Sequence, residues 1–289
     1  MLTGVFSVVY PGVEPFLGDF LQSLATQGDR DFVLFLINDG CAGLDRSLAA
    51  YPLNVEVKES SGSPTALRKA GIAWVAAAGA EIILFADADD YFAPNRIGLS
   101  KSRLSGHDII CNELMVVGSE IPSPFGMLGT RLKEAEVISS AHILHGNCLG
   151  LSNTAIRASM IPDCLDQIPD EMIAIDWTFF SLCLHFGAKA VFTQKTMTYY
   201  RQHGNNTAFI RPLTEEQILR GVRVKADHYR FLSKYQGEVA PLAANFGGLL
   251  AKLTANGARR REYCRAVQRL SAPAPYWWEP IKTMEELGL

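Results

Sequence analysis

The apolar residues of the first hundred positions follow two spacings that alternate along the chain. Short apolar runs, continuous or alternating with polar residues, predict strands at residues 5–10, 32–37, 53–57, 82–86 and 108–111. Between the first two runs, apolar side chains recur at helical spacing and predict a helix with one apolar face: Phe16, Leu17, Phe20, Leu21 and Leu24. Two further helices are expected to begin at Ser63-Pro64 and at Pro94, because serine caps helices and proline fits their first turn.

This order of strands and helices predicts an α/β fold with a mainly parallel sheet flanked by helices. In such sheets, ligands bind beyond the carboxyl ends of the strands. Polar turns follow three of the predicted strands at those ends: Pro11-Gly12, Asn38-Asp39-Gly40 and Asp87-Ala88-Asp89-Asp90. Parallel strands bring these three turns to one edge of the sheet, which we call the rim, and we expect the functional site there.

The second half of the chain has a less regular pattern. Residues 118–129 contain two prolines and read as an irregular loop, and residues 141–207 mix short helices and strands, with a short helix-like segment at 153–160. Beyond residue 211 the apolar spacing becomes helical. We therefore expect a helical segment to follow the α/β part.

Composition and charge narrow the class of protein. The chain has 289 residues, of which 48% are apolar and 20% charged, which excludes a disordered or collagen-like chain. A net charge of −3 excludes nucleic-acid binding through the overall charge. Residues 1–210 carry 14 Lys and Arg against 22 Asp and Glu, a net of −8, whereas residues 211–289 carry 13 against 8, a net of +5. The two segments are therefore expected to have different roles.

The six cysteines do not form a recognisable framework. None belongs to a Cys-x-x-Cys pair or has a histidine at zinc-finger spacing, which favours buried thiols in a reducing compartment. The first residues also lack a basic region followed by an apolar signal segment. Both observations lead us to expect a cytoplasmic protein.

The acidic turn Asp87-Ala88-Asp89-Asp90 is the strongest chemical signal. Three carboxylates at the end of a buried strand repel one another unless a cation lies between them. A hard divalent cation, Mn²⁺ or Mg²⁺, suits oxygen ligands and keeps open positions for a substrate phosphate. The alternative is a solvated acidic turn that caps the next helix, since aspartate is a common turn residue.

Two other motifs are weak when taken alone. Asn38-Asp39-Gly40 is an ordinary turn sequence, and its value comes from its place at a strand end. Gly62, Arg68 and Gly71 could place a guanidinium group and backbone amides beside an anion. They fit equally well a helix start with one exposed arginine.

Together, in this order and spacing, the motifs resemble those of family 2 glycosyltransferases of the GT-A fold. There the motifs read strand-Pro-Thr-Tyr-Asn, Asp-Asp-Gly-Ser, Asn-x-Gly…Ala-Arg-Asn-x-Gly and Asp-x-Asp-Asp, and the match covers residues 4–111. This chain departs from them at Gly12-Val13-Glu14, Asn38, Cys41, Ser61 and Lys69. The resemblance implies a GT-A domain at 1–210, with a nucleotide-binding half at 1–112 and an acceptor half at 113–210. A helical C-terminal extension would follow at 211–289.

The resemblance also implies roles for individual residues. Asp39 would accept a hydrogen bond from the nucleobase, and Asp89 would bind the metal ion together with Asp87 and His203. The residues expected at the nucleotide are Pro11, Gly12, Glu14, Asp39, Gly62, Arg68, Asp87 and Ala88.

A fainter match lies in the second half. Family members often carry a Glu-Asp pair before an aromatic helix, and Ile175-Asp176-Trp177 occupies that place here. Asp176 is therefore expected to be the general base, with a helix N-cap as the alternative. The segment from Tyr199 to Asn206 resembles the family's closing Tyr-Arg-x-His segment, in which His203 contacts the metal or diphosphate or is a plain loop histidine.

The expected function is a metal-dependent, inverting glycosyltransferase of glycan or polysaccharide biosynthesis. It would take a nucleotide-diphosphate sugar, with a UDP-sugar favoured, and a glycan or lipid-linked acceptor. One alternative is a haloacid-dehalogenase-like phosphatase, although Asp90-Tyr91 stands where Gly-Thr or Gly-Val is expected. A non-catalytic sugar-nucleotide binder and, less favoured, a nucleotidyltransferase are the others.

The C-terminal segment carries a cluster of basic residues followed by aromatic ones. The basic residues are Lys252, Arg259, Arg260, Arg261, Arg265 and Arg269, and Tyr276-Trp277-Trp278 follow. A solvated helix face with its aromatic residues packed on the core explains them best. Peripheral contact with an anionic membrane, at its inner face, is the second interpretation, and a homodimer contact is the third.

Overall fold

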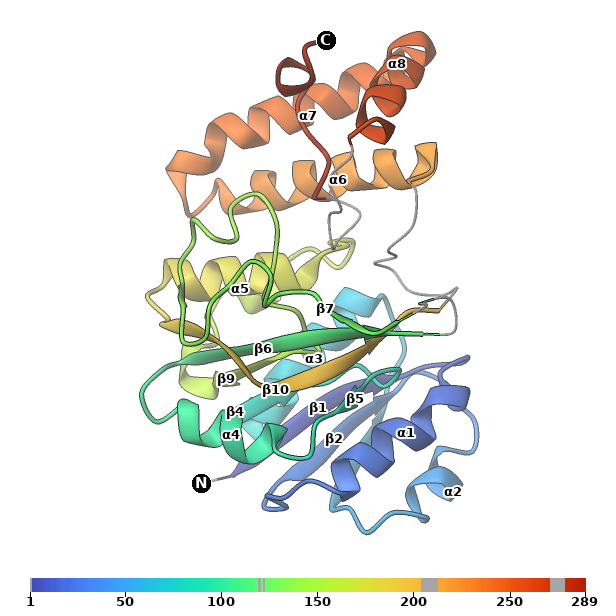
Figure 1. The fold of residues 1–289 in the computed structure, drawn as a ribbon, viewed down its shortest axis with the longest axis vertical. Helices are drawn as coiled ribbons and strands as arrows, with labels where there is room; N and C mark the ends of the chain where they lie inside the picture. The colour runs from blue at the N-terminus through green and yellow to red at the C-terminus, as the bar shows by residue number, and fades with distance from the viewer. Residues whose placement is uncertain (1, 119–120, 122, 204–212, 271–278) are drawn as a thin grey trace.

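The computed structural model describes all residues except 1, 119–120, 122, 204–212 and 271–278. Within that part, one sheet is enclosed by helices on both faces (Figure 1). Its strands are β1 Thr3–Val9, β2 Val33–Asn38, β3 Val55–Glu59, β4 Ile82–Phe85, β5 Tyr91–Phe92, β6 Ile109–Val117, β7 Phe125–Gly126, β8 Val137–Ile138, β9 Thr154–Arg157 and β10 Ala190–Arg201. The α-helices are α1 Glu14–Ala25, α2 Leu44–Leu48, α3 Pro64–Ala77, α4 Arg96–Arg103, α5 Ile175–His185, α6 Glu215–Leu232, α7 Ala240–Ala255 and α8 Gly257–Gln268.

The strand order is β3-β2-β1-β4-β9-β6-β10-β5. The long registers, β3-β2-β1-β4 and β6-β10, are parallel, whereas β9 runs antiparallel between β4 and β6 over short registers. The predicted α/β fold with a mainly parallel sheet is therefore confirmed. The expected strands and helices of the first hundred residues form within a few positions of the predicted bounds.

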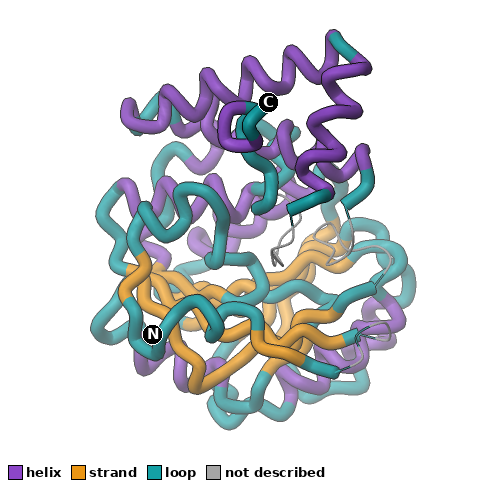
Figure 2. The backbone as a smooth tube through the Cα atoms, turned by 45° about the horizontal axis from the view of Figure 1, so that its top comes forward, coloured by secondary structure: helices purple, strands orange, loops and turns teal. Residues whose placement is uncertain are grey.

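Two apolar layers cover the sheet. One lies under α1, α2 and α4, and the other lies under α3 and α5 and continues into α6–α8 (Figures 1 and 2). Strand β1 serves both layers by alternation, with Val5 on the first side and Phe6 on the second. Gly71 of α3 lies against the Phe6 ring so closely that a Cβ would be 1.9 Å from Cζ. Gly71 is thus a packing residue of the α3–β1 contact.

The helix-like segment expected at residues 153–160 is a strand. Thr154–Arg157 forms β9, and only the following Ala158–Met160 turns as a short 3₁₀ helix. Ala155 and Ile156 are buried on opposite faces of the sheet, where β9 pairs with β4 and β6. Pairing of this segment with β4 and β6, which are distant in the sequence, therefore overrides its local helical pattern.

The expected C-terminal helices form over the described residues 213–270, with Thr214 and Gln217 making a capping box at the start of α6. Their core is continuous with that of α5, since His228 of α6 stacks on Trp177 with ring centroids 3.9 Å apart. Tyr276-Trp277-Trp278 lie outside the described residues, as does the expected boundary at residue 210. No helix of the described part is long and apolar enough to cross a bilayer.

Candidate active site

The three turns of the rim meet at the carboxyl ends of β1, β2 and β4, as the strand pattern predicts. The Asp39 amide donates a hydrogen bond to the Val9 carbonyl at 2.8 Å, and the Ala86 amide donates to the Phe6 carbonyl at 3.0 Å. Each bond extends a parallel pairing by one residue beyond its strand. Asp39 and Asp87 therefore lie on opposite sides of the end of β1.

The turn after β1 is exposed and carries Pro11, Gly12 and Glu14. Gly12 has a φ of +97°, a left-handed conformation that glycine adopts without a Cβ clash. Its amide donates to Glu14 Oε2 at 2.6 Å, and the Cys41 thiol donates to Glu14 Oε1 at 3.8 Å. Glu14 thus joins the first turn of the rim to the second.

Asn38 shapes the second turn. Its Oδ1 accepts from the Cys41 amide at 2.8 Å, and its Nδ2 donates to Glu59 Oε1 at 3.0 Å. An ionised aspartate, which the family motif has at this place, could not donate to Glu59. Asparagine at position 38, in place of the aspartate of the motif, therefore suits its hydrogen-bond partners. The next residue, Asp39, is half-buried at the edge of the rim.

Asp87 pairs with a cation of the protein itself. Arg68 Nη2 donates to Asp87 Oδ1 at 3.0 Å, and about a third of each side chain is exposed, 30% for Arg68 and 32% for Asp87. Burial raises the pKa of Asp87, Arg68 lowers it, and neighbouring Asp89 raises it. Ala88, the next residue of the motif, is buried in the core under the rim.

Asp89 faces the closing segment at the end of β10. Its Oδ2 lies 2.9 Å from His203 Nε2 and accepts a hydrogen bond from the Tyr10 hydroxyl at 3.4 Å. The His203 ring stacks on Phe16 of α1, with centroids 4.5 Å apart. The structure therefore joins two of the three residues expected at the metal, Asp89 and His203, whereas Asp87 is engaged with Arg68.

Asp90 points into the protein and holds structure together. It is fully buried and accepts hydrogen bonds from the Ser152 hydroxyl and from the Arg201 amide, the latter at 2.8 Å. Burial raises the pKa of Asp90 well above its usual range, and the neighbouring carboxylates Asp89 and Asp87 raise it further. Asp90 is thus not exposed to a ligand at the rim.

Two arginines supply positive charge beneath and beside the acidic turn. Arg96 is buried and donates to the Phe85 carbonyl at 2.6 Å, and burial lowers its pKa to about 9 although Asp90 and Asp87 raise it. Arg201 Nε donates to the Asp89 carbonyl at 2.9 Å. Arg68 and Arg96 lower the pKa of Asp87, so the protein's own cations offset part of the negative charge of the acidic turn. The repulsion among its carboxylates is therefore not by itself evidence for a metal ion.

Asp89 and His203 could supply two ligands to a metal ion. No group of three or more His, Cys, Asp or Glu side chains is arranged as a metal site in the part of the chain that the structure describes. One carboxylate and one imidazole, already 2.9 Å apart, are a suitable pair of ligands for Mn²⁺. Oxygen atoms of a bound diphosphate would complete the set, as is common for Mg²⁺ sites.

The start of α3 is fixed to the loop before α5. Lys69, which stands where the family motif has asparagine, pairs with Asp170 Oδ1 at 2.6 Å, and the Ser63 hydroxyl donates to the Asp170 carbonyl at 2.7 Å. Ser63 also caps α3, as predicted. Gly62 is exposed, and a Cβ there would make only ordinary contacts. The local chain therefore positions Arg68 relative to α5, and Gly62 is not required by packing.

Asp176 lies in the first turn of α5, where the charges of both Arg68 and Asp87 act on it. Its Oδ2 accepts a hydrogen bond from Asn147 Nδ2 at 3.2 Å. Burial raises the pKa of Asp176, while the Trp177 amide and the charge of Arg68 lower it. The N-cap of α5 is Ala174, so the interpretation of Asp176 as a cap is wrong.

Three residues of this site were missed by sequence reasoning: Tyr10, Asn147 and Arg201. Tyr10 directly precedes the first turn, and Arg201 belongs to the recognised closing segment, so each had a positional signal. Asn147 had none, because its contact with Asp176 spans 29 residues of irregular chain.

No family model and no curated protein sequence matches this chain. Solved structures do. Staphylococcus aureus TarS 1–349 in complex with UDP-GlcNAc superposes with a TM-score of 0.60 at 17% identity, covering 100% of this chain and 92% of that one. The mannosyltransferase PcManGT from Pyrobaculum calidifontis, in complex with GDP-Man and Mn²⁺, gives 0.56 at 14% identity, covering 96% and 85%.

Both similarities extend over nearly the whole chain, so they include the helices after residue 213 as well as the sheet. At identities this low, the structural similarity establishes the fold, and the activity has to be argued from the site. The expected fold is thereby confirmed: the chain has the GT-A fold of glycosyltransferases.

Proposed function

We propose that this protein is a glycosyltransferase that moves a sugar from a nucleotide-diphosphate donor to a hydroxyl group of an acceptor. The observation that carries the proposal is the position of Arg68. Its guanidinium group bonds Asp87 on the rim, and the carboxylates of Asp87 and Asp176 together raise its pKa against the effect of burial. One cation thus joins the donor side of the site to the candidate base.

On the donor side, the rim residues bind the nucleotide. Asp39 accepts a hydrogen bond from the base, beside the exposed turn of Pro11 and Gly12, and Asp87 contacts the ribose. Asp89 and His203 hold a divalent cation, which neutralises the diphosphate leaving group when bound. Support for this arrangement comes from the fold, whose solved relatives include complexes with UDP-GlcNAc and with GDP-Man and Mn²⁺.

On the acceptor side, Asp176 takes the proton from the attacking hydroxyl. A carboxylate accepts that proton best when its pKa lies nearer the working pH, and burial moves the pKa of Asp176 in that direction. Asn147 donates a hydrogen bond to Oδ2 and so helps to orient the carboxylate toward the acceptor. Attack opposite the leaving group inverts the anomeric centre.

The proposal is tested by donor binding and by donor turnover measured separately. Thermal unfolding is followed with UDP-GlcNAc and with GDP-Man, each with and without Mn²⁺, and nucleotide release is then measured for any donor that stabilises the protein. We expect one donor to raise Tm and to be consumed. Stabilisation without nucleotide release would indicate a non-catalytic binder. Release of inorganic phosphate from p-nitrophenyl phosphate, without donor turnover, would indicate a phosphatase.

A further inference from the structure

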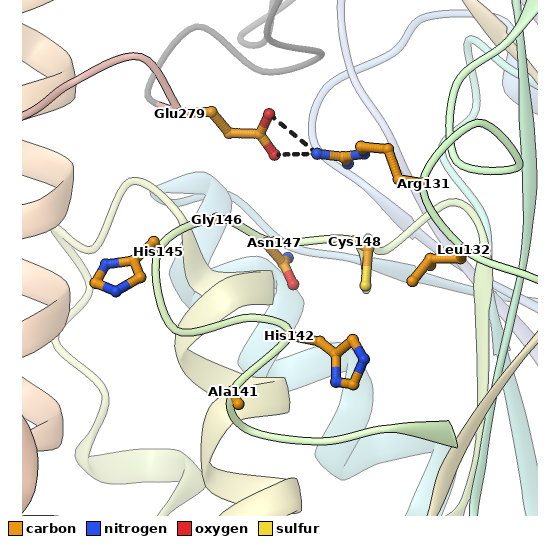
Figure 3. A pocket seen from close by; sticks show the side chains of 9 residues that line it. All are labelled: Arg131, Leu132, Ala141, His142, His145, Gly146, Asn147, Cys148 and Glu279. Carbon is orange, nitrogen blue, oxygen red and sulfur yellow. Dashed lines mark hydrogen bonds and ion pairs between the residues drawn. The ribbon is translucent and has the colours of Figure 1, made fainter. Parts of the chain in front are cut away.

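A cavity of about 360 Å³ lies in the part of the chain expected to bind the acceptor (Figure 3). Its volume falls within the range of about 300–1,000 Å³ typical of small-molecule sites. Most of its wall comes from the chain between β7 and β9, and one side chain comes from the C-terminal segment. The lining residues are Arg131, Leu132, Ala141, His142, His145, Gly146, Asn147, Cys148 and Glu279.

Asn147 connects this cavity to the candidate base. It lines the cavity, and its Nδ2 donates to Asp176 Oδ2 at 3.2 Å and to the Leu149 carbonyl at 2.8 Å. Arg68 and Asp87 both influence the Asp176 carboxylate electrostatically, Arg68 lowering its pKa and Asp87 raising it. The cavity wall therefore contacts the candidate base through the Asn147–Asp176 hydrogen bond.

The cavity is polar without an uncompensated charge. Arg131 Nη1 is paired with Glu279 at 3.2 and 3.3 Å from its two carboxylate oxygens, the contact drawn in Figure 3. Burial lowers the pKa of His145, and the charges of Lys225 and Lys282 lower it further, which favours the neutral ring. Such a wall offers hydrogen-bond donors and acceptors together, which is what hydroxyl groups require. Because the two charges of the Arg131–Glu279 pair offset each other, this pair favours neither an anionic nor a cationic ligand.

The C-terminal extension builds the far wall. Glu279 precedes a short segment held against the helices, because Lys225 Nζ of α6 donates to the Ile281 carbonyl at 2.8 Å and the Tyr263 hydroxyl of α8 donates to the Lys282 carbonyl at 2.6 Å. Ile281 is completely buried. Gly146 allows the Glu279 side chain to pack against the loop, since a Cβ at this position would come within 2.9 Å of Glu279 Oε1. The extension thus fixes the size of the cavity.

We propose that this cavity is the acceptor subsite and that it takes an uncharged, polyhydroxylated unit, a sugar residue, whose reactive hydroxyl reaches Asp176 past Asn147. This inference rests on the proposed function, since it assigns the second substrate of the same site. It gives the C-terminal extension a role in acceptor selection through Glu279.

The test measures direct binding and needs no turnover. Saturation-transfer NMR is recorded for the full chain with a panel of methyl glycosides of glucose, galactose, mannose and N-acetylglucosamine, in the presence of UDP and Mn²⁺. Ala141→Trp fills the cavity from an exposed position in its wall, and Ser140→Trp places the same bulk on the adjacent exposed residue, which does not line it. Thermal unfolding of both variants confirms that they fold.

At least one glycoside should give saturation transfer with the wild-type protein and with Ser140→Trp. Its affinity should fall about tenfold or more in Ala141→Trp, a loss that corresponds to about 1.4 kcal/mol. A signal that Ala141→Trp leaves unchanged, or no signal for any glycoside, overturns the inference. Failure of the proposed function looks different, because nucleotide sugars then fail to bind while glycoside binding still depends on Ala141.

Discussion

Arg68 and Asp87 form an ion pair at 3.0 Å that joins helix α3 to the end of strand β4. Because Arg68 also acts on Asp176, this pair links the two halves of the site, the donor rim and the candidate base. The three carboxylates of the acidic turn have different surroundings. Asp87 pairs with Arg68, Asp89 faces His203, and Asp90 is buried under the turn.

Asp89→Ala is expected to abolish Mn²⁺-stimulated donor turnover and leave the fold intact, because Asp89 supplies the carboxylate of the proposed metal site. Turnover is measured after removal of divalent ions and after re-addition of Mn²⁺. The exposed Asp163→Asn serves as a control for the loss of one negative charge and should respond to Mn²⁺ as the wild type does. Full Mn²⁺ stimulation of Asp89→Ala would eliminate the metal role of this residue.

Asp176→Asn is expected to reduce transfer by about 10²-fold or more, the range for loss of a general base, while nucleotide binding is retained. The amide has nearly the volume of the carboxylate but cannot take the acceptor's proton. Single-turnover transfer and nucleotide affinity are measured on the same preparation. Asp166→Asn, an exposed change on the loop before α5, is the control. Transfer at the wild-type rate in Asp176→Asn would remove the base assignment.

The pH profile reports the environment of Asp176. Burial raises its pKa above the ordinary value of 3.8, and the base acts only when ionised, so kcat should fall as the pH drops through this raised value. The Asn147 hydrogen bond favours the ionised form. Asn147→Ala should therefore raise the pKa and move the acid limb to higher pH. A limb that stays in place or moves to lower pH contradicts the role of Asn147.

Arg96→Met should destabilise the protein by about 3–5 kcal/mol, the cost of removing one partner from a buried set of charges. Arg96 lies beneath the acidic turn with Asp90 and has no access to solvent. Urea unfolding measures the loss. Arg103→Met breaks the much more exposed pair with Glu134 and should cost about 0–1 kcal/mol. Equal losses for the two variants would show that burial of Arg96 does not determine its contribution.

Gly71→Ala should destabilise the protein by about 1–3 kcal/mol, since its methyl group overlaps the Phe6 ring and the core must shift. The matched change Gly247→Ala, in helix α7 with open space around the added methyl group, should stabilise by about 0.4–1 kcal/mol. Chemical unfolding of both variants measures the difference. A neutral Gly71→Ala would mean that α3 packs less tightly on β1 than the structure has it.

The strands, the rim and most of the candidate site residues could be predicted from the sequence because their signals are local. Apolar runs locate β1, β2 and β4, and parallel pairing then brings Asp39 and Asp87 to one edge. The different surroundings of the three carboxylates in the acidic turn could not be predicted. Which carboxylate is buried depends on Ser152 and Arg201, which lie 62 and 111 residues from Asp90.

The acceptor side was harder to predict for the same reason. β9 is a strand only because β4 and β6 flank it, and residues 153–157 alone do not indicate this. The cavity wall pairs Arg131 with Glu279, a contact across 148 residues that places a C-terminal side chain beside the acceptor half. No spacing in the sequence signals such a contact.

A crystal structure with a UDP-sugar or GDP-sugar and Mn²⁺ would show where the donor binds relative to Asp89 and Asp176. We expect the diphosphate on the rim, with the metal between Asp89, His203 and the phosphate oxygens, and with the sugar on the side of Asp176. A nucleotide bound elsewhere, or an Asp176 carboxylate facing away from the sugar, would contradict the account.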